Sequence, residues 1–188
     1  MVRPVTSEST DRDAEVRLLH RVARGDRGAF SELFDRYHPR LFKFLFRLTS
    51  SYSTADELTN DVLLAVWQSA SKFRGDARVS TWIFGIAYRQ ALRRLRARRL
   101  RLLPISDSDS PVDSGQHAIE NEDWVRAAIR ELPPKQQLTL LLVYYVGLTC
   151  EETARATDVP VNTVKTRMFH ARRKLKSHLS SATEGNDD

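Results

Sequence analysis

Apolar residues recur at intervals of three and four along most of the chain, the spacing that places side chains on one face of an α-helix. In the first half, this pattern predicts helices over about residues 13–24, 33–48 and 54–72. Residues 74–79 read as a loop by composition, and Ser80 is a suitable N-cap for a fourth helix that continues through an arginine-rich segment. Strand signals are scarce, so the pattern indicates an all-α fold.

The second half repeats the helical pattern with stronger stop signals. Residues 124–132 place their apolar side chains on one face, and Pro133 ends that helix. Pro134 suits the first turn of the next helix, whose apolar core segment spans residues 138–146 and stops at Gly147. This segment is too apolar for a helix with one solvated side, which predicts that it lies in the core.

Residues 104–117 interrupt the apolar pattern and are dominated by Ser, Asp, Pro and Gly. Such a segment buries little, so it reads as a flexible acidic linker. We therefore expect two small helical domains, at 11–103 and 118–180. Extended, the 14 linker residues would reach about 48 Å, roughly 14 base pairs of duplex, so the domains could occupy separate sites on one DNA.

Charge is divided unevenly between these segments. Lys plus Arg number 30 against 24 Asp plus Glu, a modest excess on its own. Residues 77–106 contain no acid, however, and 89–101 include seven arginines. A second acid-free stretch runs over residues 159–183. Basic residues gathered in this way are typical of surfaces that bind a polyanion such as nucleic acid.

Several functional classes find no support in the sequence. Cys150 is the only cysteine, so neither an internal disulfide nor a cysteine zinc site is expected. The polar N-terminus lacks the apolar region of a signal peptide, and the longest apolar run, 138–146, is far too short for a membrane span. No phosphate loop, nucleophile motif or metal-ligand cluster occurs. We expect a cytoplasmic protein without membrane insertion, metal or cofactor, and not an enzyme.

Residues 149–178 read as a helix-turn-helix. Thr149-Cys-Glu-Glu152 matches a capping box and predicts a helix over 150–157. Asp158-Val-Pro160 reads as a turn, and a basic helix follows over about 161–179. The competing interpretation is a helical hairpin whose basic side is simply solvated. The capping box, tight turn and acid-free second helix favour DNA binding, with the second helix in the major groove.

The order and spacing of short motifs resemble those of extracytoplasmic-function (ECF) sigma factors of bacterial RNA polymerase, from about Leu18 to Leu179. Each motif is weak alone, whereas the whole series is specific. The matching segments are Gly25-Asp-Arg-Gly-Ala-Phe30, Leu33-Phe-Asp-Arg-Tyr-His-Pro-Arg-Leu41, Ala55-Asp-Glu-Leu58 with Asp61 and Trp67, Phe73-Arg-Gly75, Ser80-Thr-Trp-Ile-Phe-Gly-Ile-Ala87, Leu132-Pro-Pro-Lys-Gln136, Gly147-Leu-Thr149 and Val159-Pro-Val-Asn-Thr-Val-Lys-Thr-Arg167.

The resemblance implies a sigma factor that binds core RNA polymerase, recognises two promoter elements and helps to melt DNA. It assigns the upstream (minus-35) element to Val161, Asn162, Thr163, Lys165, Thr166, Arg167, Phe169, His170 and Arg173. It assigns the downstream (minus-10) element to Phe73, Arg74, Gly75, Asp76, Arg78, Ser80, Trp82, Arg89 and Arg93. It assigns polymerase binding to Asp56, Glu57, Asn60 and Asp61. An anti-sigma factor or another regulator acting in trans is a further expected partner.

This sequence departs from the family pattern at several positions. Ile86-Ala-Tyr-Arg89 stands where Ile-Ala-Arg-Asn is common, and His170 replaces a frequent arginine. Asp158 takes the place of the usual turn glycine, which Asp tolerates because it visits left-handed conformations. One alternative function is a conventional helix-turn-helix regulator that does not join polymerase, although it leaves residues 18–103 without a role. The other is a nucleic-acid enzyme, for which no site motif is present.

Overall fold

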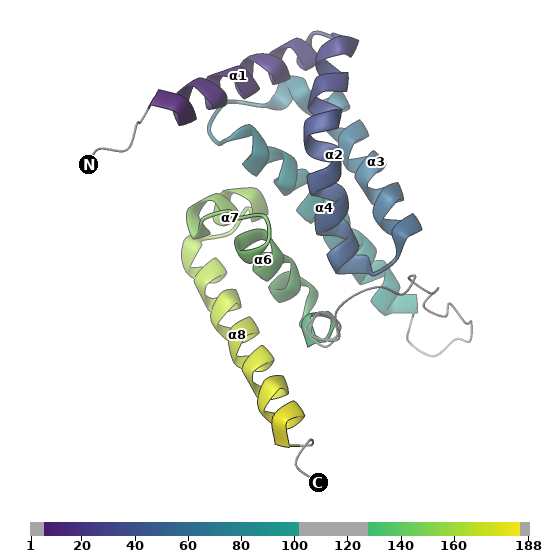
Figure 1. Cartoon of the computed structure of the whole chain (residues 1–188), viewed down its shortest axis with the longest axis vertical. Helices are drawn as coiled ribbons and strands as arrows, with labels where there is room; N and C mark the ends of the chain where they lie inside the picture. The colour runs from purple at the N-terminus through teal and green to yellow at the C-terminus, as the bar shows by residue number, and fades with distance from the viewer. Residues whose placement is uncertain (1–5, 102–127, 185–188) are drawn as a thin grey trace.

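The computed structural model describes residues 6–101 and 128–184, and within these ranges it contains helices and no strand (Figure 1). The all-α prediction is confirmed. The predicted linker, 104–117, lies outside the described residues. The N-terminal unit consists of α1 (Thr6–Ala23), α2 (Arg27–Thr49), α3 (Tyr52–Ser69), the short 3-10 helix η1 (Ala70–Lys72) and α4 (Val79–Arg101), and the C-terminal unit of α6 (Pro134–Tyr144), α7 (Cys150–Thr157) and α8 (Val161–Glu184).

The N-terminal unit is organised around α2, whose buried residues recur at helical spacing from Ala29 to Leu48. The Asp26 side chain caps its first turn by accepting from the Ala29 N–H at 3.0 Å, and this bond together with Arg21 lowers the pKa of Asp26. Buried Tyr37 donates its hydroxyl to Glu15 on α1 at 2.7 Å. Burial and the neighbouring Glu15 raise the pKa of Tyr37, which keeps the phenol protonated.

One predicted helix start is wrong by two residues. Ser80 was expected as N-cap, but α4 already begins at Val79, and the Trp82 N–H bonds to the Arg78 carbonyl. The buried side chains of Val79 and Ile83 draw the first turn onto the core, so packing sets the boundary in place of the serine hydroxyl. Ser80 instead lies half-buried within that turn.

Local signals in the C-terminal unit behave as the sequence predicts. Pro134 is the first residue of α6, and Thr149 and Glu152 form the capping box of α7 through reciprocal bonds of 2.9 and 3.1 Å. Asp158 adopts the left-handed conformation, with φ 53°, that turns the chain into α8. Helix α8 extends beyond the predicted residue 179, to Glu184.

The two units pack against each other (Figure 1). Six consecutive residues of α6, 137–142, are buried, so this helix has no solvated side over that stretch. Leu140 belongs to the core of the C-terminal unit, whereas Leu138, Leu141 and Leu142 belong to the same apolar cluster as residues of α2 and α4. The helix α6 therefore serves two cores at once.

Candidate promoter and polymerase interfaces

Helix α8 presents one side to solvent and the other to its own domain. Val164, Met168 and Ala171 are buried against α6 and α7, which fixes the orientation of the helix. Opposite them, at intervals of four, seven and eleven residues, four exposed side chains share one side, which we call the reading face. The reading face consists of Asn162, Thr166, Phe169 and Arg173.

The chemistry of the reading face suits a groove of duplex DNA. It combines an amide, a hydroxyl and a guanidinium with an aromatic ring that is 61% exposed. The Arg173 guanidinium lies 5.9 Å from the centre of the Phe169 ring, and His170 packs edge-on to the same ring. Exposed Lys165 borders this side of the helix. Amides, guanidinium groups and apolar carbons are the groups that read base edges in a major groove.

The remaining residues predicted for the minus-35 element lie off this face. Val161, Thr163, Arg167 and His170 are half-buried. The Arg167 guanidinium donates to the Tyr88 hydroxyl of α4 at 3.4 Å, so it points toward the N-terminal unit. The sequence prediction therefore joined a solvent-facing set with half-buried residues, of which Arg167 contacts the N-terminal unit.

The predicted minus-10 residues occupy the loop before α4 and one side of α4 itself. The Phe73 ring is buried and packs edge-on against Trp82, with ring centres 5.6 Å apart, so it anchors the start of the loop to α4. Gly75 has φ 79°, a conformation that favours glycine in this turn. Ser80 and Trp82 are half-buried, and the exposed members are Arg74, Gly75, Asp76, Arg78, Arg89 and Arg93.

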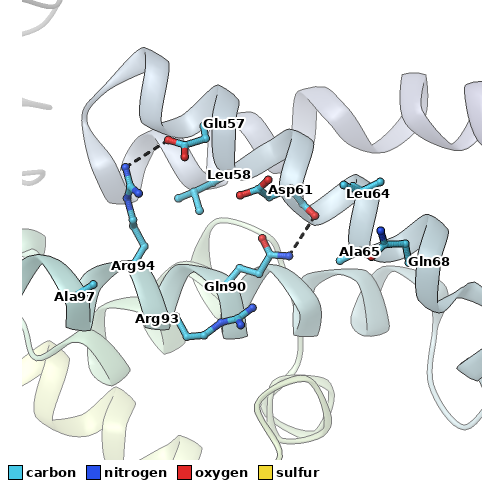
Figure 2. Close-up of a pocket in the computed structure, with 10 residues that line it drawn as sticks. All are labelled: Glu57, Leu58, Asp61, Leu64, Ala65, Gln68, Gln90, Arg93, Arg94 and Ala97. Atoms are coloured by element: carbon cyan, nitrogen blue, oxygen red, sulfur yellow. Dashed lines mark hydrogen bonds and ion pairs between the residues drawn. The ribbon is translucent and has the colours of Figure 1, made fainter.

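A shallow groove of about 510 Å³ runs between α3 and α4, and Figure 2 shows the side chains that line it. Two contacts bridge it: Arg94 lies 3.4 Å from the Glu57 carboxylate toward one end, and nearer the middle the Gln90 amide donates to the Asp61 carbonyl at 3.2 Å. The groove continues beside Arg93 into a second hollow. That hollow is lined by Ala65, Gln68, Ser69, Lys72, Ile86, Arg89, Gln90 and Arg93, and carries no acidic side chain.

Sequence reasoning missed the α3 contribution to this groove. Gln68 of α3 and Lys72 of η1 carry no motif of their own, and only the packing of this segment beside α4 brings them next to Arg89 and Arg93. The available signal was the polar side of α3, which the sequence analysis assigned only as far as Asp61. The groove thus joins the predicted polymerase and minus-10 residues at a common edge.

The residues predicted to bind polymerase form the outer side of α3, which we call the acidic face: Asp56, Glu57, Asn60 and Asp61. Asp56 is half-buried and lies 4.0 Å from His38 on α2, and the other three are exposed. Leu64, one turn beyond Asp61 and at the C-terminal end of this polar surface, is 53% exposed. An exposed leucine beside an acidic patch is a pattern typical of a protein-binding surface, and the sequence prediction omitted it.

No group of three or more potential metal ligands occurs within residues 6–101 and 128–184. Over the same ranges, no helix has the length and apolar character that crossing a bilayer requires. Cys150 is half-buried at the start of α7 and packs against the core of the C-terminal unit.

Comparisons with known proteins agree with this division into two units. The family model for sigma-70 region 2 matches residues 33–101, and that for sigma-70 region 4 matches residues 122–175. The ECF sigma factor SigM of Mycobacterium tuberculosis is 34% identical over 174 residues, covering 92% of this chain and 87% of SigM. The ECF sigma factor RpoE of Cereibacter sphaeroides is 34% identical over 182 residues, covering 93% of this chain and 99% of RpoE.

Solved structures share the fold. CnrH in complex with the cytosolic domain of CnrY aligns with a TM-score of 0.68 at 23% identity, covering 89% of this chain and 98% of CnrH. RpoE from Bartonella quintana, in complex with the anti-sigma factor NepR, aligns with a TM-score of 0.65 at 21% identity, covering 80% of this chain and 96% of that one. With both sigma-70 regions matched and relatives similar over nearly their whole length, the chain belongs to the ECF family of RNA polymerase sigma factors and is a promoter-recognising initiation factor.

Proposed function

We propose that three surfaces divide the work of this sigma factor. The reading face of α8 recognises the minus-35 element, the loop before α4 together with the α3–α4 groove binds and opens the minus-10 element, and the acidic face of α3 docks on core RNA polymerase. The observation that carries the proposal is the reading face itself, whose four side chains are all exposed while the opposite side of the same helix is buried. Buried and exposed sides so arranged suit a helix held rigidly for insertion into a groove.

At the minus-35 element, each side chain of the reading face has a chemically distinct task. The Asn162 amide can both donate and accept, as bidentate recognition of adenine requires. The Phe169 ring offers an apolar surface to a thymine methyl group, and Arg173 beside it suits guanine or a phosphate. Thr166 already donates its hydroxyl to the Asn162 carbonyl at 2.9 Å, so toward DNA it acts as an acceptor.

At the minus-10 element, the chemistry required is capture of an unstacked base. Unstacking costs a few kcal/mol, which binding of the extruded base must offset. The hollow beside Arg89 supplies amide groups from Gln68 and Gln90 for base edges, and cations for the phosphates on either side. Buried Phe73 and half-buried Trp82 hold the neighbouring loop in shape, so we assign them a positioning role.

The acidic face of α3 suits a basic helical surface of the polymerase. Exposed Leu64 provides an apolar contact at one end of this face, and the carboxylates that precede it provide the charge that steers and orients a cationic partner. Glu57 is partly neutralised by Arg94, which leaves Asp61 as the stronger electrostatic determinant.

Regulation, location and the absence of catalysis complete the proposal. CnrH was solved with the cytosolic domain of CnrY, and the Bartonella quintana RpoE was solved with the anti-sigma factor NepR. We propose that this chain likewise meets a regulatory protein in trans. We further propose that it acts in the cytoplasm, where promoters and core polymerase reside, and that it has no enzymatic activity of its own.

The test of the polymerase surface is association of the purified chain with core RNA polymerase, followed by gel filtration or anisotropy. Asp61→Lys should weaken association at least tenfold, because it reverses an exposed charge of the acidic face beside Leu64. Asp35→Lys is the matched control, since Asp35 is also exposed on a helix of the same unit but lies outside that face. Equal affinity of both variants and the wild type would remove α3 as the docking surface.

A further inference from the structure

Two side-chain contacts join α3 to α4 within the N-terminal unit. On α3, Glu57 and Asp61 lie one turn apart, and on α4, Gln90 and Arg94 also lie one turn apart. The Gln90 amide donates to the Asp61 carbonyl at 3.2 Å, and the Arg94 guanidinium lies 3.4 Å from the Glu57 carboxylate. Figure 2 shows both contacts reaching from α4 to α3. The helix proposed to dock on polymerase is thus tied directly to the helix proposed to bind DNA.

The two contacts differ in the groups that they occupy. Gln90 bonds to a backbone carbonyl, so this contact does not use the Asp61 carboxylate. Arg94, by contrast, engages the side-chain carboxylate of Glu57, which belongs to the acidic face. Both side chains nevertheless remain about half exposed, 48% for Arg94 and 58% for Glu57. A partner arriving from solvent can therefore reach either charged group and displace the other.

Arg94 stands in a segment whose other cations we assign to DNA. Arg89 and Arg93 line the acid-free hollow, and Arg93 and Arg94 both line the adjoining groove. Once released from Glu57, the Arg94 guanidinium would carry an unpaired charge beside the place proposed for the minus-10 strand. The flat, multiply donating guanidinium group is well suited to the oxygen atoms of a phosphate. Arg94 is absent from the minus-10 residues assigned from the sequence.

Glu57 is likewise claimed from two sides. It belongs to the acidic face, whose charge suits a basic surface of core polymerase. In the free chain its carboxylate already lies beside a cation, so a cation of the polymerase must displace Arg94 to pair with it fully. In the same way, a DNA phosphate must draw Arg94 away from Glu57. Two intermolecular contacts therefore compete with one intramolecular ion pair.

We propose that Arg94 is a further DNA-binding residue that is held in reserve by Glu57: a basic group of core polymerase takes Glu57, and the released Arg94 binds a promoter phosphate. This inference rests on the function proposed above for the acidic face and for α4. Because the pair is broken only once, whichever partner binds first removes that cost for the second, and linkage makes the effect reciprocal. Exposed ion pairs shift an equilibrium by about 1.4- to 5-fold, which sets the size of the coupling.

The test is a double-mutant cycle in the full-length chain, built from Arg94→Gln and Glu57→Gln. The first measurement is association with core polymerase in the absence of DNA, followed by anisotropy. Arg94→Gln should tighten association by up to about fivefold, because it leaves the Glu57 carboxylate free for the polymerase. In the Glu57→Gln background, the same substitution should have no effect, because there is no carboxylate to release.

Arg96→Gln is the matched control for charge. Arg96 is exposed on the same helix but does not line the groove, so its substitution removes one positive charge without touching the pair. A general gain from lower positive charge would appear equally in Arg96→Gln and would persist in the Glu57→Gln background. Circular dichroism of each variant checks that the helices are intact, as expected for exposed positions.

The second measurement is the salt dependence of promoter binding by the assembled holoenzyme. Arg94→Gln should reduce the log–log slope by about 0.9, the value for one phosphate contact. Glu57→Gln, at protein concentrations that keep the holoenzyme fully assembled, should leave this slope unchanged, because polymerase has already released Arg94 in the wild type. One substitution thus tightens polymerase binding while it weakens the electrostatic part of DNA binding, which loss of a merely structural ion pair would not do.

Three results would each overturn the inference. Arg94→Gln could leave polymerase association unchanged or weaken it, it could tighten association equally in the Glu57→Gln background, or it could leave the salt slope of the holoenzyme unaltered. Asp61→Lys separates this failure from that of the proposed docking surface. If Asp61→Lys weakens association while Arg94→Gln does not tighten it, only the coupling fails; if Asp61→Lys also leaves association unchanged, the acidic face is not the docking surface.

Discussion

Phe169 provides the sharpest test of the reading face because its ring is large, apolar and exposed. Nothing in the fold of the free chain requires an exposed phenylalanine in the middle of a basic helix, whereas a major groove offers thymine methyl groups to such a ring. We therefore examine Phe169→Ala. The substitution should leave the stability of the chain within about 0.5 kcal/mol of the wild type, as for most surface changes.

The expected loss of DNA affinity follows from the exposed area. Full burial of a phenylalanine contributes about 1.5–3 kcal/mol relative to exposure. Because 61% of Phe169 is still exposed in the free chain, about 1–2 kcal/mol of that remains for DNA binding to recover. At about 1.4 kcal/mol for each tenfold change, Phe169→Ala should raise the dissociation constant about 5- to 25-fold.

The assay is promoter binding by the holoenzyme, measured by anisotropy on a promoter located by mapping transcript 5′ ends. Tyr144→Ala is the matched control, since Tyr144 is 62% exposed on α6 and lies away from the reading face. Thermal unfolding of both variants checks stability. A dissociation constant unchanged by Phe169→Ala, or raised equally by Tyr144→Ala, would refute the placement of Phe169 against DNA.

Further predictions concern charge, pH and local stability. Arg173→Ala should reduce the salt dependence of promoter binding by about 0.9 in log–log slope if Arg173 neutralises one phosphate, whereas Arg24→Ala, exposed near the α1–α2 turn, should leave the slope unchanged. The pKa of Tyr37 is raised from its ordinary 10.0, so its contribution to the free energy of unfolding is complete below pH 10 and declines above it. Tyr37→Phe should therefore reduce the fall in the free energy of unfolding as the pH rises above 10. A fall that is equally steep in the variant and the wild type would contradict this. Thr149→Ala removes half of the capping box and should lower the free energy of unfolding, measured with denaturant, by about 1 kcal/mol. Thr54→Ala is the control because the Thr54 hydroxyl caps no helix, and an equal loss in that variant would argue against a capping origin.

Local chemistry was sufficient to predict much of the fold. The capping box at Thr149, Pro134 at the first position of α6 and the left-handed Asp158 act within a few residues, and each is confirmed. The error at Ser80 has the opposite origin. There, burial of Val79 against distant residues moved the helix start, and no nearby residue signals such packing.

Features that depend on two segments meeting lay beyond the sequence. Gly85 stands in a predicted helix without any local reason for a glycine. The reason appears only in the packed structure, where the backbone of Ala156, seventy-one positions later, leaves no room for a Cβ atom at this position. Likewise, the run of apolar residues in α6 predicted a core helix, but it did not predict that the helix contributes to two cores. Arg167 was assigned to DNA by its position in a motif, and its bond to Tyr88 depends on how the units pack.

The central claim is that two separate surfaces of this chain direct core RNA polymerase to promoters. The most direct measurement is sequencing of transcript 5′ ends made in vitro from genomic DNA by core polymerase, with and without the purified chain. We expect new start sites that share two short sequence elements at minus-35 and minus-10, and we expect Phe169→Ala to weaken use of the upstream element selectively. Start sites that are the same with and without the chain would contradict the claim.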